Sequence, residues 1–123
     1  MLLRTASLVA TMTLALGVTP AQAQQSLTPA ARQALECAAY SAIMSDEMED
    51  PEAATGLQFA MAYFVGVAIG RQPEVDIVEA FDAALINFVA DNIDEIGGRC
   101  LPQIEKMGDD LSKVGNALPE SEL

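Results

Sequence analysis

The sequence predicts an all-α fold, a small four-helix bundle or orthogonal helical domain that one disulfide closes. Proline follows a capping residue at two points of the chain, which is typical of helix starts. Apolar residues recur every three or four positions between these points, and we find no convincing segment with the strict alternation of a half-buried strand. The chain has two cysteines, an even number that suits one disulfide.

Residues 1–23 have the pattern of a cleaved secretory signal. Arg4 provides a positive charge, a short apolar run follows, and Ala21 and Ala23 place small residues before the expected cut. The run is short for a hydrocarbon core about 30 Å thick, although an uncleaved anchor stays an alternative. We therefore expect export to the periplasm and one domain over residues 24–123, with an ordered core at about 28–117.

Capping signals divide this domain into four predicted helices, 29–47, 51–69, 73–96 and 99–117. Thr28 and Asp50 each precede a proline, so they suit N-caps with proline at the first helical position. The segment 72–74, Gln-Pro-Glu, is a weaker start of the same kind. Three glycines occupy positions where C-terminal caps are common, namely Gly70, Gly97 and Gly98.

The second predicted helix is the most apolar part of the domain, since residues 53–70 carry no charge. Apolar side chains cover two of its faces, so it should be surrounded by protein or by lipid. Its acidic N-terminal flank and the amphipathic helices on either side favour protein. We expect it at the centre of a soluble bundle, with a membrane span as the alternative. One of its faces is a candidate client or partner face, formed by Leu57, Met61, Phe64 and Ala68.

The third and fourth predicted helices each carry one apolar stripe. The third stripe is Ile77, Val78, Phe81, Leu85, Phe88 and Val89. The fourth steps by three and four residues through Ile104, Met107, Leu111, Val114 and Leu118. Each stripe needs an apolar partner, and packing around the second helix would satisfy both.

Cys37 and Cys100 are predicted to form a disulfide, because an exported protein with an even cysteine count usually oxidises. Closing a loop of about 60 residues should stabilise the folded state by roughly 4 kcal/mol. A metal pair and a catalytic thiol are the alternatives. Both are disfavoured because the chain has no histidine and no C-x-x-C motif.

No catalytic apparatus is recognisable in the sequence, so we expect neither an enzyme nor a cofactor. Histidine, a G-x-S-x-G motif and a glycine-rich phosphate loop are all missing. Acidic residues cluster at 46–52 and 91–95, but their spacing does not match a calcium loop, and we interpret them as solvated helix ends. The 18 acidic and 6 basic residues give a formal charge of −12, which argues against nucleic acid as a partner.

The chain resembles the HdeA-type periplasmic acid-stress chaperones. The resemblance rests on Leu35-Glu36-Cys37 followed by Tyr40, on the segment 62–66, Ala-Tyr-Phe-Val-Gly, and on the second cysteine, Cys100. Two departures are the wider spacing of the cysteines and the lack of a tryptophan before the first one. The resemblance implies a chaperone in which acid protonates carboxylates, loosens the bundle and uncovers the apolar second helix for unfolded clients.

A constitutive envelope binding module, of the inhibitor or immunity type, is the alternative function. Its target would offer a basic surface, because the chain is strongly acidic. An uncharacterised structural role also stays open. In either main case the partners are proteins, a stable membrane span is not expected, and a homodimer is left open.

Overall fold

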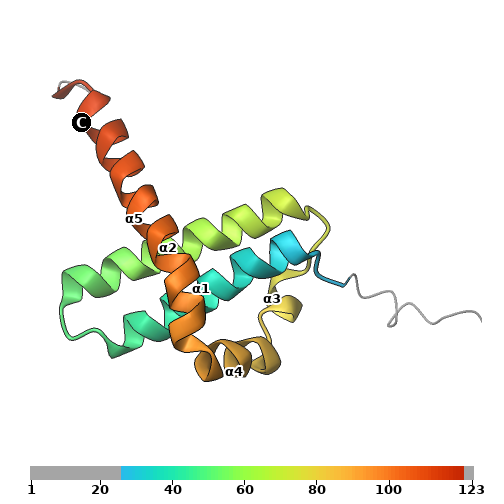
Figure 1. The fold of residues 1–123 in the computed structure, drawn as a ribbon. Coiled ribbons are helices and arrows are strands. Elements are labelled where there is room, and N and C mark those ends of the chain that lie inside the picture. Colours follow the sequence, from blue (N-terminus) through green and yellow to red (C-terminus); the bar gives the residue numbers. More distant parts are fainter. Residues whose placement is uncertain (1–25, 121–123) are drawn as a thin grey trace, which may run out of the picture.

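The structure is a computed structural model that describes residues 26–120, and within that range the chain forms five helices and no strand (Figure 1). They are α1 (Pro29–Glu47), α2 (Pro51–Arg71), α3 (Ile77–Ala80), α4 (Ala83–Asp91) and α5 (Ile93–Ala117). The all-α fold class is therefore confirmed. The predicted signal and its cleavage site lie outside the described residues and stay predictions.

The first two helices begin where the capping signals predict. The Thr28 hydroxyl accepts a hydrogen bond from the Ala31 N–H at 3.1 Å, and an Asp50 carboxylate oxygen accepts from the Glu52 N–H at 3.3 Å. Proline occupies the first turn of both helices, where its missing N–H breaks no helical hydrogen bond. Local chemistry thus sets both helix starts.

α1 and α2 lie side by side as an antiparallel hairpin (Figure 1). Near its open end, the Gln72 side chain accepts a hydrogen bond from the Thr28 N–H and donates one to the Ser26 carbonyl, at 2.8 and 3.2 Å. Near the turn, the Ser45 hydroxyl donates to the Ala54 carbonyl at 3.2 Å. Gln72 therefore ties α2 to the start of α1, and it does not begin a third helix as its place before proline had suggested.

The centre of the domain is α1, and the prediction that the second helix lies there is wrong. Nearly every turn of α1 is buried on several sides, whereas α2 buries one narrow stripe. The reason is side-chain size, because small residues let neighbouring helices approach α1 closely from more than one direction. The small buried residues of α1 are Ala31, Ala34, Cys37, Ala38, Ala39, Ser41 and Ser45.

The predicted third helix, 73–96, is broken into α3, α4 and the first turn of α5, and aspartates cap the first two of these helix starts. Asp76 accepts a hydrogen bond from the Glu79 N–H, and Asp82 accepts one from the Leu85 N–H. These caps stabilise ends in the middle of the apolar stripe. The second piece, α4, packs Leu85 and Val89 against the core.

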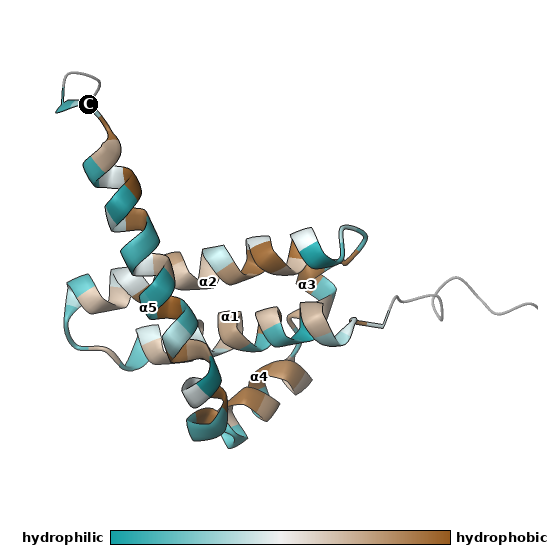
Figure 2. Ribbon diagram, turned by 45° about the horizontal axis from the view of Figure 1, so that its top comes forward, coloured by the Kyte–Doolittle hydropathy of each residue, from teal (hydrophilic) through white to brown (hydrophobic). Residues whose placement is uncertain are grey.

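α5 begins at Ile93, so the predicted boundary at residues 97–99 is wrong. Gly97 and Gly98 lie inside this helix, and no described glycine has the positive φ of a C-terminal cap. Pro102 also lies inside α5 and not in its first turn. It has no N–H to donate to the carbonyl of Gly98, a residue that is exposed. From Gly108 onward every described residue is exposed, and this part of α5 projects away from the other helices (Figures 1 and 2).

The predicted disulfide is confirmed, since Cys37 and Cys100 are joined with their Cα atoms 5.4 Å apart. It fastens the beginning of α5 to the middle of α1. Beside it, the buried Glu36 carboxylate pairs with Arg32 at 3.1 Å and with Arg99 at 2.6 Å. The disulfide and the ion pair between Glu36 and Arg99 therefore hold α1 and α5 together at the same place.

Gly97 has a packing role that its neighbour Gly98 lacks, and alanine substitutions test the difference. A Cβ atom at Gly97 would lie 2.9 to 3.1 Å from the ring of Tyr40, whereas a Cβ at Gly98 meets nothing within 4 Å. Replacing glycine by alanine inside a helix should raise the free energy of unfolding by about 1 kcal/mol. We expect this gain for Gly98→Ala. In Gly97→Ala the new methyl group should displace the Tyr40 ring and offset this gain. The free energy of unfolding of Gly97→Ala should therefore be about 1–2 kcal/mol lower than that of Gly98→Ala.

Urea denaturation followed by circular dichroism measures both variants, with Gly98→Ala as the matched control. Equal stabilisation of the two would contradict the close contact between Gly97 and Tyr40.

Candidate functional site

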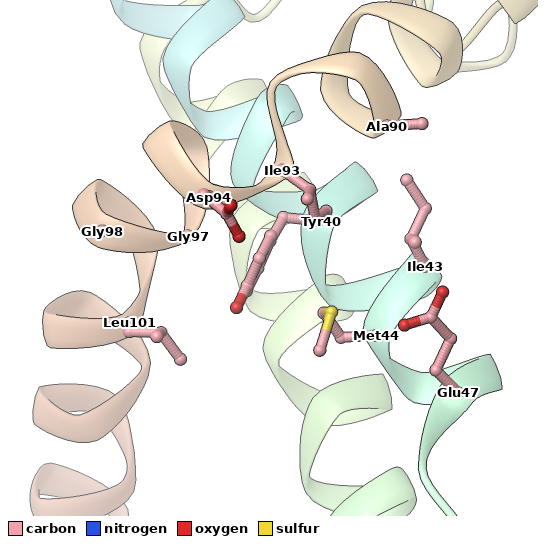
Figure 3. A pocket seen from close by; sticks show the side chains of 10 residues that line it. All are labelled: Tyr40, Ile43, Met44, Glu47, Ala90, Ile93, Asp94, Gly97, Gly98 and Leu101. Carbon is pink, nitrogen blue, oxygen red and sulfur yellow. The ribbon is translucent and has the colours of Figure 1, made fainter.

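A groove of about 530 Å³ lies between α1 and the start of α5 (Figure 3). Its volume falls in the range usual for ligand sites in proteins. One wall comes from a single face of α1, where residues three or four apart line up, and the facing wall comes from the first turns of α5. The lining residues are Tyr40, Ile43, Met44, Glu47, Ala90, Ile93, Asp94, Gly97, Gly98 and Leu101.

The disulfide and its ion pairs set the position of this groove. Cys37 lies one helical turn before Tyr40, and Cys100 lies directly before Leu101. Because the two cysteines are bonded, the residues one turn further along α1 must face the neighbouring turn of α5. Gly97 then leaves room for the Tyr40 ring to pack against the backbone of α5.

Tyr40 is buried at the floor of the groove, and its phenol has a perturbed acidity. Burial raises the pKa of Tyr40, and the nearby charge of Asp94 raises it further. The fold therefore holds the phenol proton more tightly than the unfolded chain does. Tyr40 thus contributes stability that is complete below the unfolded pKa and is lost as the pH rises through the folded value.

Two carboxylates approach the groove from opposite walls, Asp94 from α5 and Glu47 from the end of α1 (Figure 3). Neither forms an ion pair with another described residue. No lysine or arginine lines the groove within the described range. An apolar floor with two unpaired negative charges suits a ligand that has an aliphatic body and a positive group.

The described residues give less support to metal binding or catalysis in this groove. No group of three metal-ligating side chains could hold an ion in that part of the chain. Tyr40 and the carboxylates have no nucleophile or histidine base beside them.

The face predicted for clients points inward. Phe64 and Ala68 are buried in the core, and Leu57 and Met61 are half-buried. The opposite face of α2 is the exposed one, with Phe59 64% and Tyr63 46% exposed. The structure thus places the predicted face against the rest of the domain and leaves a different apolar face open.

α2 also has the length and composition of a membrane-crossing helix, and little of it is buried. Its C-terminal end is nonetheless hydrogen-bonded to the start of α1, through Gln72 to Thr28 and through the Arg71 guanidinium, which donates to the Ala30 carbonyl at 2.8 Å. Near its N-terminal end, the Ala54 carbonyl accepts from the Ser45 hydroxyl. These bonds favour the hairpin as a unit in which α2 remains beside α1.

Sequence reasoning missed the groove because it treated the acidic residues as solvated helix ends. The signal that could have found it is the cysteine pair together with Tyr40. Once Cys37 and Cys100 are taken as bonded, Tyr40, one turn after Cys37, is expected beside the part of α5 around Cys100, where Gly97 and Leu101 lie.

Comparisons with models of protein families, with curated proteins and with solved structures find no match for this chain. The resemblance to HdeA-type chaperones therefore stays a prediction that rests on the residues alone.

Proposed function

We propose that the chain is an exported binding module that holds a basic, apolar-flanked segment of a partner protein in the groove between α1 and α5. The observation that carries the proposal is the pair of unpaired carboxylates, Asp94 and Glu47, on opposite walls of an otherwise apolar groove. Export rests on the signal pattern of residues 1–23.

A lysine or arginine side chain has the two-part chemistry that such a groove can satisfy. Its aliphatic stem can lie on Ile43, Met44 and Ile93, and its charged head can stay near water between the carboxylates. Each exposed charge pair adds little energy, so several contacts must act together. An extended or helical segment with apolar residues beside the basic one provides them.

The charge of the whole chain supports the same class of partner. A formal charge of −12 attracts basic surfaces and speeds their association at low salt. Large apolar side chains are already exposed in the folded state, among them Phe59, Leu111 and Val114. This exposure supports a module that binds without prior unfolding.

Substitution of the groove carboxylates tests the proposal. We expect a synthetic helical peptide of leucine and lysine to bind the wild type and to shift the amide resonances of Gly97, Gly98 and Leu101. Asp94→Asn combined with Glu47→Gln should weaken binding about tenfold, since two charge pairs are lost. Isothermal titration calorimetry and nuclear magnetic resonance give the affinity and the location.

The matched control is Glu74→Gln combined with Glu120→Gln, which removes two exposed charges away from the groove. It should change the affinity less than about twofold, because distant exposed charges are screened. Equal weakening by both double variants would show that only net charge matters and would contradict a groove site. A peptide of leucine and glutamate should not bind.

An acid-activated chaperone is the second candidate, and the Glu36 cluster favours it. Glu36 is buried between Arg32 and Arg99 and thereby links α1 to α5. Loss of the negative charge of Glu36 would remove both ion pairs. Loosening of α5 would then uncover the side of α1 on which α5 packs, where Tyr40 lies.

Glu36→Gln removes this charge at neutral pH and so imitates the acid form. If the second candidate is correct, the wild type should raise the recovery of an acid-labile client enzyme returned from about pH 3, where carboxylates are mostly protonated. Glu36→Gln should hold the unfolded client already at neutral pH, whereas the exposed control Glu105→Gln should not. Unchanged client recovery with a fully folded wild type at acid pH would rule out this candidate.

A further inference from the structure

The projecting end of α5, residues 105–118, which we call the arm, has an apolar stripe that nothing in the described chain covers. Ile104 and Met107 pack against the core, and the stripe continues beyond it. Its outer residues are Leu111, Val114 and Leu118, which are 57%, 59% and 48% exposed. From Gly108 onward every described residue is exposed, and this part of the arm projects away from the other helices (Figures 1 and 2).

The arm is a weak helix on its own. It has about 13 helical residues, a length at which an isolated helix is marginal in water. Gly108 and Gly115 each cost about 1 kcal/mol relative to alanine in a helix. Its ion pairs, from Lys106 and Lys113 to Asp110, are exposed and add little. A covering partner on the apolar stripe would stabilise it.

The spacing of the stripe indicates what kind of surface fits it. Ile104, Met107, Leu111, Val114 and Leu118 step by three and four residues, which is the period of the seam in a two-stranded coiled coil. Such a seam needs a second helix with the same period. The arm of another copy of this chain is a helix of this kind.

The charges of the arm also favour a second copy over a basic partner. Glu105 and Asp109 lie on the side of the helix opposite the stripe. Asp110 lies at the edge of the stripe, and a hydrogen bond from Lys106 holds the pKa of Asp110 below its ordinary value. This carboxylate is thus already paired within its own helix. The stripe therefore has no unpaired carboxylate that could attract a basic partner. It also has no charge that would have to be buried when a second uncharged stripe packs on it.

We propose that two copies of this chain pair through their arms as an antiparallel two-stranded coiled coil with two-fold symmetry. The antiparallel direction follows from charge, because it places the two acidic bodies at opposite ends of the pair. The arm is about 20 Å long, which exceeds the screening length of roughly 8 Å at physiological salt. A parallel pair would instead bring the two bodies together.

Two-fold symmetry selects a simple register. Leu111 of one arm lies beside Val114 of the other, and Leu118 meets the part of Met107 that its own core leaves uncovered, while each Ile104 remains on its own core. This register also places Gly108 of one arm close to Gly115 of the other. A Cβ atom at either glycine meets nothing within 4 Å in the single chain, so both flanks are open to a close approach.

Substitution on and off the stripe tests the pairing by sedimentation velocity over a dilution series of the full chain. The wild type should dimerise reversibly, and added salt should strengthen the dimer because it screens the like charges of the bodies. Leu111→Lys should raise the dissociation constant at least about tenfold, because it buries an unpaired charge. The matched control Ser112→Lys adds the same charge on the opposite side of the arm and should dimerise as the wild type does.

A mixture of two variants tests the register. Leu111→Lys and Val114→Glu should each be monomeric, and their mixture should form a heterodimer in which the new charges meet. Failure of the mixture to associate would overturn the register. A wild type that stays monomeric at millimolar concentration would overturn the pairing. So would a loss of dimerisation in Ser112→Lys as large as that in Leu111→Lys.

Peptide binding to the groove uses a different face of the protein. It should persist in Leu111→Lys, so failure of either proposal can be recognised separately.

Discussion

The attachment of α5 to the middle of α1 is the constraint on which the rest of the structure depends. The Cys37–Cys100 bond joins the two helices, and Glu36 pairs with Arg99 directly beside it. This attachment aligns the turn after Cys37 with the start of α5, and the groove is the space between them. It also directs the remainder of α5 away from the body as the arm (Figure 1). Both proposed binding surfaces thus follow from one junction.

Features that depend on neighbouring residues could be predicted from the sequence. The Thr28 and Asp50 caps and the starts of α1 and α2 follow from residue types at fixed spacing. The disulfide was predicted on a different ground, the even cysteine count together with expected export. The break between α3 and α4 could not be predicted in the same way. Apolar periodicity favoured one continuous helix there, while Asp76 and Asp82 offered caps to two shorter ones. The sequence alone does not indicate which signal prevails, because tertiary packing decides it.

The identity of the central helix and the location of the groove depended on contacts between distant residues. Hydropathy pointed to α2 as the centre, but the small residues of α1 allow closer packing from several sides. Gly97 looked like a helix end, and it is in fact the point where the ring of Tyr40 meets α5. The face that includes Phe64 was predicted correctly as one apolar face of a helix. Its role as a client surface is a proposal that requires the bundle to loosen.

Amide hydrogen exchange of the oxidised and the reduced protein, at a concentration where the chain is monomeric, tests the role of the α1–α5 junction most directly. We expect residues 93–104 to be protected in the oxidised protein and to lose that protection on reduction, while α1 and α2 keep theirs through their own hydrogen bonds and packing. The amides of the arm should exchange fast in both forms. Protection of residues 93–104 that survives reduction, or a uniform loss across the whole domain, would contradict the account.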